Sequence, residues 1–135
     1  MAQNRTPTIN SRYYVPREEF LTVVHFCRQY PQWLAELSTE LDPRRGVNYD
    51  QDKVSSSGEP DPTFSIAARR AAISRKKDIV EHTAQHVAHD LYKWLLLGVG
   101  YDYSFYQLQE RGMPCSRNVY YAMRRQFFYE LAKSI

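Results

Sequence analysis

A group of polar side chains near the carboxyl end of the chain has the types and the spacing for hydrogen bonding to nucleic acid. Arginine, asparagine and tyrosine recur within residues 116–125, directly after a turn that contains Gly112 and Pro114. Arginine and asparagine can each form paired hydrogen bonds with a base edge in the DNA major groove. The residues that we expect to face DNA are Ser116, Arg117, Asn118, Tyr121, Arg124 and Arg125.

The order of these residues along the chain predicts which of them contact bases and which contact phosphates. Arg117, Asn118 and Tyr121 come first and are expected to reach base edges, as the early residues of a recognition helix do. Arg124 and Arg125 come later and are expected to contact phosphates, which adds affinity that depends on salt.

Positive charge is concentrated in the same segment. Residues 111–135 carry five basic side chains and one acidic side chain, a net charge of +4, whereas the whole chain carries +3. Ser116 precedes the helical residues and is expected to cap them. The alternative interpretation is a packed terminal helix whose arginines are only solvated.

Three histidines have the spacing of metal ligands. His82, His86 and His89 recur at i, i+4 and i+7, so they could share one stripe of a helix. The chain has no His-Glu-x-x-His motif and no cysteine at ligand spacing, and the stripe crosses a predicted helix boundary. We therefore expect a polar helix face, with no metal, no cofactor and no catalytic residues.

Basic residues also gather in the middle of the chain. Their spacing spreads them around more than half a turn of a helix, which is typical of a solvated face. A direct contact with flanking DNA or with a partner protein is the alternative. The residues of this cluster are Arg69, Arg70, Arg75, Lys76 and Lys77.

The elements that must position these side chains are all predicted to be helices. Apolar residues recur at spacings of three and four throughout, and in the last helix they predict one buried face. The helices are expected over about 16–41 with a break near Pro31, 62–86, 88–97 ending at Gly98, and 103–111, followed by the terminal helix. The buried residues of the terminal helix are expected to be Tyr120, Met123, Phe127 and Leu131.

The order of these elements predicts an all-α fold with an N-terminal helical hairpin followed by a C-terminal helix-turn-helix. Residues 1–14 are expected to be a flexible arm. Residues 15–97 would form the hairpin and a third helix, with a Pro-, Gly-, Ser- and Asp-rich linker at 42–61. Residues 98–135 would form the helix-turn-helix module.

The composition indicates a protein of the cytoplasm. Cys27 and Cys115 are far apart and belong to no paired spacing, so we expect reduced thiols. The longest apolar run, Trp94–Val99, is far too short to span a membrane, and the amino terminus lacks the apolar core of a signal peptide.

Three stretches of the sequence resemble a known family. They are RYYVPREEFLTVVHFCRQY, DPTFSIAARRAAISRKKDIVE and MPCSRNVYYAMRRQFFYEL, which are distributed along the chain between residues 12 and 131. The chain resembles the phage and prophage RinA/ArpU-type late transcriptional regulators, which end in a module similar to sigma-factor region four. The resemblance implies double-stranded DNA as the partner, control of late-gene transcription in a bacterial host cell, and the same six residues, 116–118, 121, 124 and 125, facing the DNA. RNA polymerase would be a further partner.

Two other classes of protein combine similar elements. A phage DNA-packaging protein, such as a small terminase subunit, also joins a helix-turn-helix to helical hairpins. A protein-binding adaptor or inhibitor would use the same helices without DNA. If the chain forms a homodimer, the apolar hairpin is the expected interface, and the operator should then contain paired half-sites.

Overall fold

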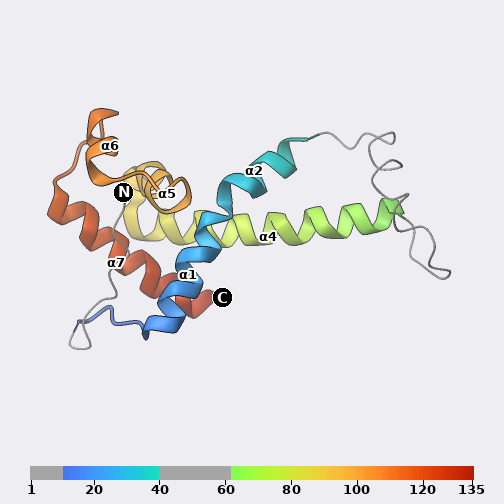
Figure 1. Cartoon of the computed structure of the whole chain (residues 1–135), viewed down its shortest axis with the longest axis horizontal. Helices are drawn as coiled ribbons and strands as arrows, with labels where there is room; N and C mark the ends of the chain where they lie inside the picture. The colour runs from blue at the N-terminus through green and yellow to red at the C-terminus, as the bar shows by residue number, and fades with distance from the viewer. Residues whose placement is uncertain (1–10, 40–61) are drawn as a thin grey trace.

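The computed structural model describes residues 11–39 and 62–135, and within these ranges the chain forms helices and no strand (Figure 1). The predicted all-α class is therefore confirmed. The predicted linker, 42–61, and the first ten residues lie outside the described residues. The helices are α1 (Arg17–Arg28), α2 (Tyr30–Ser38), α4 (Pro62–Ala88), the 3-10 helix η2 (His89–Leu91), α5 (Tyr92–Gly100), α6 (Phe105–Glu110) and α7 (Arg117–Ser134).

The first predicted helix is divided into α1 and α2, as the position of Pro31 predicted. Helix α1 follows Pro16 and has Glu18 and Glu19 in its first turn, where negative charge is favoured. The division falls at Gln29, and Pro31 lies in the first turn of α2. Proline fits this place because its missing N–H would have no partner inside the helix there.

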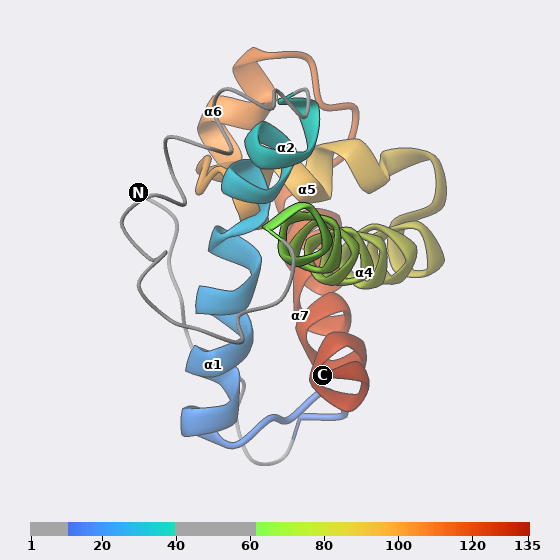
Figure 2. The same cartoon turned by 90° about the vertical axis from the view of Figure 1, so that its right-hand side faces the viewer.

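Of the first predicted helix, only the α2 part forms a hairpin with α4. Tyr30, at the start of α2, donates a hydrogen bond of 2.6 Å to Glu81, which lies late in α4. Near the end of α2, Glu36 accepts from Arg69, which lies early in α4. The two helices are therefore antiparallel. Helix α1 turns away from this pair and packs on α7 and α5 instead, as Figures 1 and 2 show.

Helix α5 ends later than predicted. Gly98 was expected to stop this helix, but α5 continues to Gly100, and Gly98 is buried inside it. A Cβ atom at Gly98 would overlap the hydroxyl group of Tyr120 on α7. The glycine is therefore explained by the close approach of α7 to α5, because only a residue without a side chain leaves room for that hydroxyl.

The helix-turn-helix order of the carboxyl end is present. Ser104 and Gln107 form a reciprocal capping box at the start of α6, with hydrogen bonds of 3.2 Å and 2.8 Å. The turn after α6 uses Gly112 at φ 105°, a conformation that favours glycine. Ser116 then caps α7 by accepting a hydrogen bond of 3.3 Å from the amide of Val119.

The helices share one hydrophobic core. Residues 97 and 98, between which the domain boundary was predicted, both lie inside α5. Buried side chains of α1, α4, α5, α6 and α7 belong to a single cluster. The arm is also partly packed. Tyr13 lies edge-on against Tyr129 of α7 at 5.5 Å, and Val15 is buried. Of the arm predicted over residues 1–14, the structure describes residues 11–14, and Tyr13 among them contacts α7.

Candidate nucleic-acid interface

One exposed stripe follows the outer side of the first turns of α7. Asn118, Ala122 and Arg125 are all exposed and recur at spacings of four and three, so they lie on one side of the helix. An amide, a methyl group and a guanidinium are three of the groups that recognise base edges and phosphates in a major groove. Ala122 was absent from the predicted set, although the same helical spacing that predicted its neighbours includes it.

A second group lies beside this stripe, where α6 and α7 meet. The guanidinium of Arg117 donates a hydrogen bond of 3.1 Å to the hydroxyl of Tyr106 on α6. Its central carbon also lies 5.9 Å from the centre of the Tyr106 ring and 5.5 Å from that of Tyr121. Two tyrosines from different helices thus hold the first residue of α7.

Tyr121 links this group to the core. Its ring lies 6.5 Å from that of Phe105 on α6 and 5.1 Å from that of Tyr120, and its side chain is only partly buried. Because Phe105 and Tyr120 are themselves buried, the position of Tyr121 is fixed on its inner side. Its outer side is available to a ligand of α7.

Arg124 does not lie where the sequence placed it. Its residue is 5% exposed, and its guanidinium lies 5.1 Å from the centre of the Phe128 ring. The buried side of α7 consists of Tyr120, Arg124, Phe127, Phe128 and Leu131, while Met123 is only partly buried. The prediction of a phosphate contact for Arg124 is therefore wrong, because this side chain points into the protein.

The charge of Arg124 acts on buried groups rather than on the surface. Burial raises the pKa values of the Cys27 thiol and of the Tyr120 hydroxyl, and the positive charge of Arg124 opposes both shifts. Cys27 is completely buried, and burial also raises the pKa of the Cys115 thiol. Neither cysteine therefore has the lowered pKa of a reactive thiolate.

Tyr106 is the site residue that the sequence interpretation missed. Tyr106 is 59% exposed, whereas Phe105 and Leu108 of the same helix are buried. The capping serine gives a signal that could have found it. With Ser104 as the cap, Phe105 and Leu108 lie three apart on the inner side, so Tyr106 falls on a different side.

A second arginine and tyrosine pair lies at the end of α6. Arg111 donates a hydrogen bond of 3.3 Å to the hydroxyl of Tyr103, and its central carbon lies 4.6 Å from the centre of that ring. Arg111 is exposed, as are Gln109 and Glu110 in the same turn. The region around the turn therefore carries both signs of charge, and its basic residues are stacked on tyrosine rings.

The basic cluster of α4 is largely occupied by contacts within the protein. Arg69 makes two hydrogen bonds to the carboxylate of Glu36, at 3.0 Å and 3.2 Å. Arg70 donates to the backbone carbonyls of Glu36, Leu37 and Thr39 at 2.9–3.1 Å and so caps the end of α2. Lys77 pairs with Asp78 and Glu81, while Arg75 and Lys76 are exposed.

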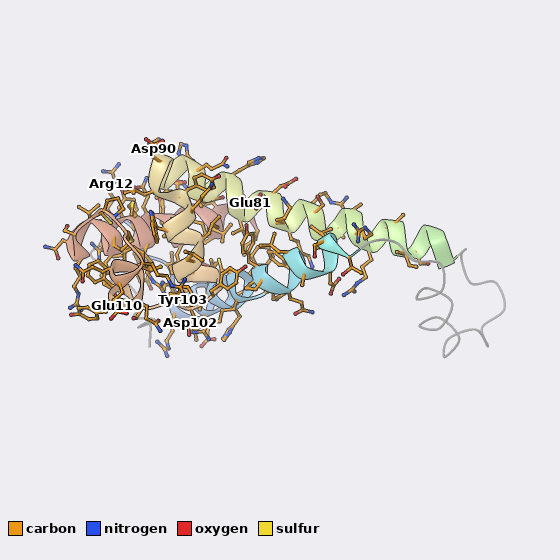
Figure 3. The ribbon with its side chains drawn as sticks, turned by 90° about the horizontal axis from the view of Figure 1, so that it is seen from above. Arg12, Glu81, Asp90, Asp102, Tyr103 and Glu110 are labelled. Atoms are coloured by element: carbon orange, nitrogen blue, oxygen red, sulfur yellow. The ribbon has the colours of Figure 1, made fainter. Side chains whose placement is uncertain are left out.

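The histidines form no shared site. His82 and His86 lie exposed on α4, and His89 follows the helix end with a left-handed backbone, φ 49°. Among the described residues no group of three or more His, Cys, Asp or Glu side chains is arranged to hold a metal ion. Asp90, next to His89, and Glu110 of α6 lie on opposite sides of the molecule in Figure 3.

Comparison with known proteins adds no relative. No protein-family model, curated protein or solved structure matches the chain. Over residues 11–39 and 62–135, no helix is both long enough and apolar enough to cross a membrane.

Proposed function

We propose that this chain is a DNA-binding regulator of transcription that reads duplex DNA with α7. The observation that carries the proposal is the exposed stripe of Asn118, Ala122 and Arg125, with Arg117 beside it. These side chains lie on the first turns of a helix that follows a glycine turn and a shorter capped helix. That order of elements supports the proposal, because a helix-turn-helix places its second helix in the major groove.

The start of α7 is electrostatically suited to an anionic ligand. The amino terminus of a helix carries a partial positive charge, and the first turn of α7 contains no acidic residue. Arg117 adds a full positive charge at the place where the helix dipole disfavours it, which costs about 0.3–1 kcal/mol. A phosphate near Ser116 and Arg117 would relieve this cost, as anions do at helix amino termini.

The roles follow from the placement of each residue. Asn118 and Arg117 would contact base edges in the first turn, where an amide pairs well with adenine and a guanidinium with guanine. Arg125, two turns farther along, would contact a phosphate, the role first expected of both Arg124 and Arg125. Ala122 offers a methyl group of the size that packs on thymine. Helix α6 would cross the DNA backbone.

We further propose that this regulator controls phage late genes. This proposal is supported by the resemblance of three stretches of the sequence to RinA/ArpU-type regulators, which also makes RNA polymerase a further partner. If two copies bind one operator, its half-sites should repeat at about 10–10.5 base pairs or a multiple of that spacing. Light scattering is then expected to show a monomer or a dimer. A larger ring would favour the alternative of a phage DNA-packaging protein.

The test is a DNA-binding assay over a salt series with wild-type protein and two matched variants. Preferred sequences are first selected from random duplexes. Arg117→Ala is expected to weaken the preferred sequence by about 1–3 kcal/mol and to relax the preference. Arg75→Ala removes an exposed arginine from α4 and should bind like wild type. A wild-type protein that binds no duplex at low salt would refute the proposal.

A further inference from the structure

The exposed tyrosine of α6 lies beside the start of α7. Tyr106 is one of the most exposed large side chains among the described residues, and its ring packs edge-on against buried Phe105 at 5.6 Å. Single exposed aromatic residues are ordinary on protein surfaces. What distinguishes Tyr106 is its hydrogen bond with Arg117, the first residue of α7.

The contact joins the two helices of the helix-turn-helix through their side chains. The Tyr106 hydroxyl accepts from Arg117 at 3.1 Å, and the Tyr121 ring lies on the same guanidinium at 5.5 Å. An arginine on a helix surface normally samples many rotamers, and fixing it on binding costs free energy. Two partners on different helices restrict that freedom before any ligand arrives.

We propose that Tyr106 is a positioning residue that orients Arg117 for sequence reading. This inference rests on the proposed function, since Arg117 is the side chain assigned to a base edge. Tyr106 accepts one N–H of the guanidinium, which leaves other N–H groups to donate to DNA. The hydroxyl keeps its own proton, so it can also donate to a phosphate while it holds the arginine.

The role predicts a loss of preference rather than a loss of fold. Tyr106→Phe keeps the ring and removes only the hydroxyl that accepts from Arg117. The preference for the selected sequence over random duplex should fall by roughly two- to ten-fold, the range that one lost hydrogen bond produces. The denaturant midpoint should not move, because the hydroxyl lies on an exposed side chain.

A double-mutant cycle tests whether Tyr106 acts through Arg117. In an Arg117→Ala background, Tyr106→Phe should have no additional effect on sequence preference. The matched control is Tyr101→Phe, which removes an exposed tyrosine hydroxyl that has no contact with Arg117 and should leave preference at the wild-type value. Additive effects of Tyr106→Phe and Arg117→Ala would overturn the positioning role.

A measurement without DNA separates this inference from the proposed function. Nitrogen relaxation at the Nε–H group of Arg117 should report an ordered side chain in wild type and a mobile one in Tyr106→Phe. An Arg117 that is equally mobile in both proteins would overturn the positioning contact. An ordered Arg117 in a protein that binds no DNA would instead overturn the proposed function.

Discussion

The arginines of α4 and the exposed arginines of α7 have different surroundings. Arg69 and Arg70 lie beside the end of α2, where a carboxylate and three backbone carbonyls accept their N–H groups. Arg117 is the first residue of α7 and Arg125 lies about halfway along it, and both are exposed. The first pair holds two helices together, whereas Arg117 contacts two tyrosine side chains and Arg125 is exposed.

Helix polarity explains the difference. The last carbonyls of a helix have no partner inside it, so a basic side chain that reaches them gains hydrogen bonds and a favourable dipole. The first turn of a helix offers N–H groups, which cannot accept from arginine. A basic cluster beside a helix end is therefore a structural feature when the end is carboxyl-terminal. A basic side chain at an amino-terminal end finds no such carbonyl, and in the proposed function Arg117 would meet an anion from outside the protein.

The largest effect is expected inside α7, between two neighbouring arginines. Arg124→Ala removes a buried side chain of α7 and should lower the free energy of unfolding by about 2–4 kcal/mol. Arg125→Ala changes an exposed side chain and should alter it by less than about 0.5 kcal/mol. Urea unfolding followed by circular dichroism measures both, and equal losses would contradict the burial of Arg124.

A smaller effect is expected at the junction of α2 and α4. Arg70→Ala removes a guanidinium that donates hydrogen bonds to three backbone carbonyls at the end of α2. Part of that site is open to water, so the loss should be about 1–2 kcal/mol. Hydrogen exchange should become faster in α2 and stay unchanged in α7. Arg75→Ala is the control, and matching exchange rates in the two variants would refute the cap.

Local rules in the sequence predicted most of the fold. Pro31 divides α1 from α2, Gly112 makes the turn, and Ser116 caps α7, because each of these effects depends on residues close in the chain. The order of helices and the exposed positions 117, 118 and 125 followed from the same rules. What local rules determine is where helices begin and end.

Two other features of the fold, the buried face of α7 and the role of Gly98, depend on contacts between segments that are distant in the sequence. Spacings of three and four fit a buried stripe that includes either Met123 or Arg124, and the choice depends on how α1 packs on α7, where Phe20 meets Phe128 at 5.3 Å. Gly98 was expected to end a helix, yet it lies inside α5, where the absence of a side chain leaves room for the hydroxyl group of Tyr120 on α7. Neither fact can be read from the residues that flank these positions.

The smallest effect is expected for the contribution of Arg125 to the affinity for DNA. Arg125→Ala should weaken preferred and random duplexes alike and reduce the slope of log affinity against log salt by about 1, because one phosphate contact is lost. Its stability should match wild type. Arg75→Ala changes an arginine of α4 that is also exposed, and it should leave the slope unchanged. If both variants reduce the slope equally, the α4 cluster also lies near the DNA, and the distinction between the two clusters fails.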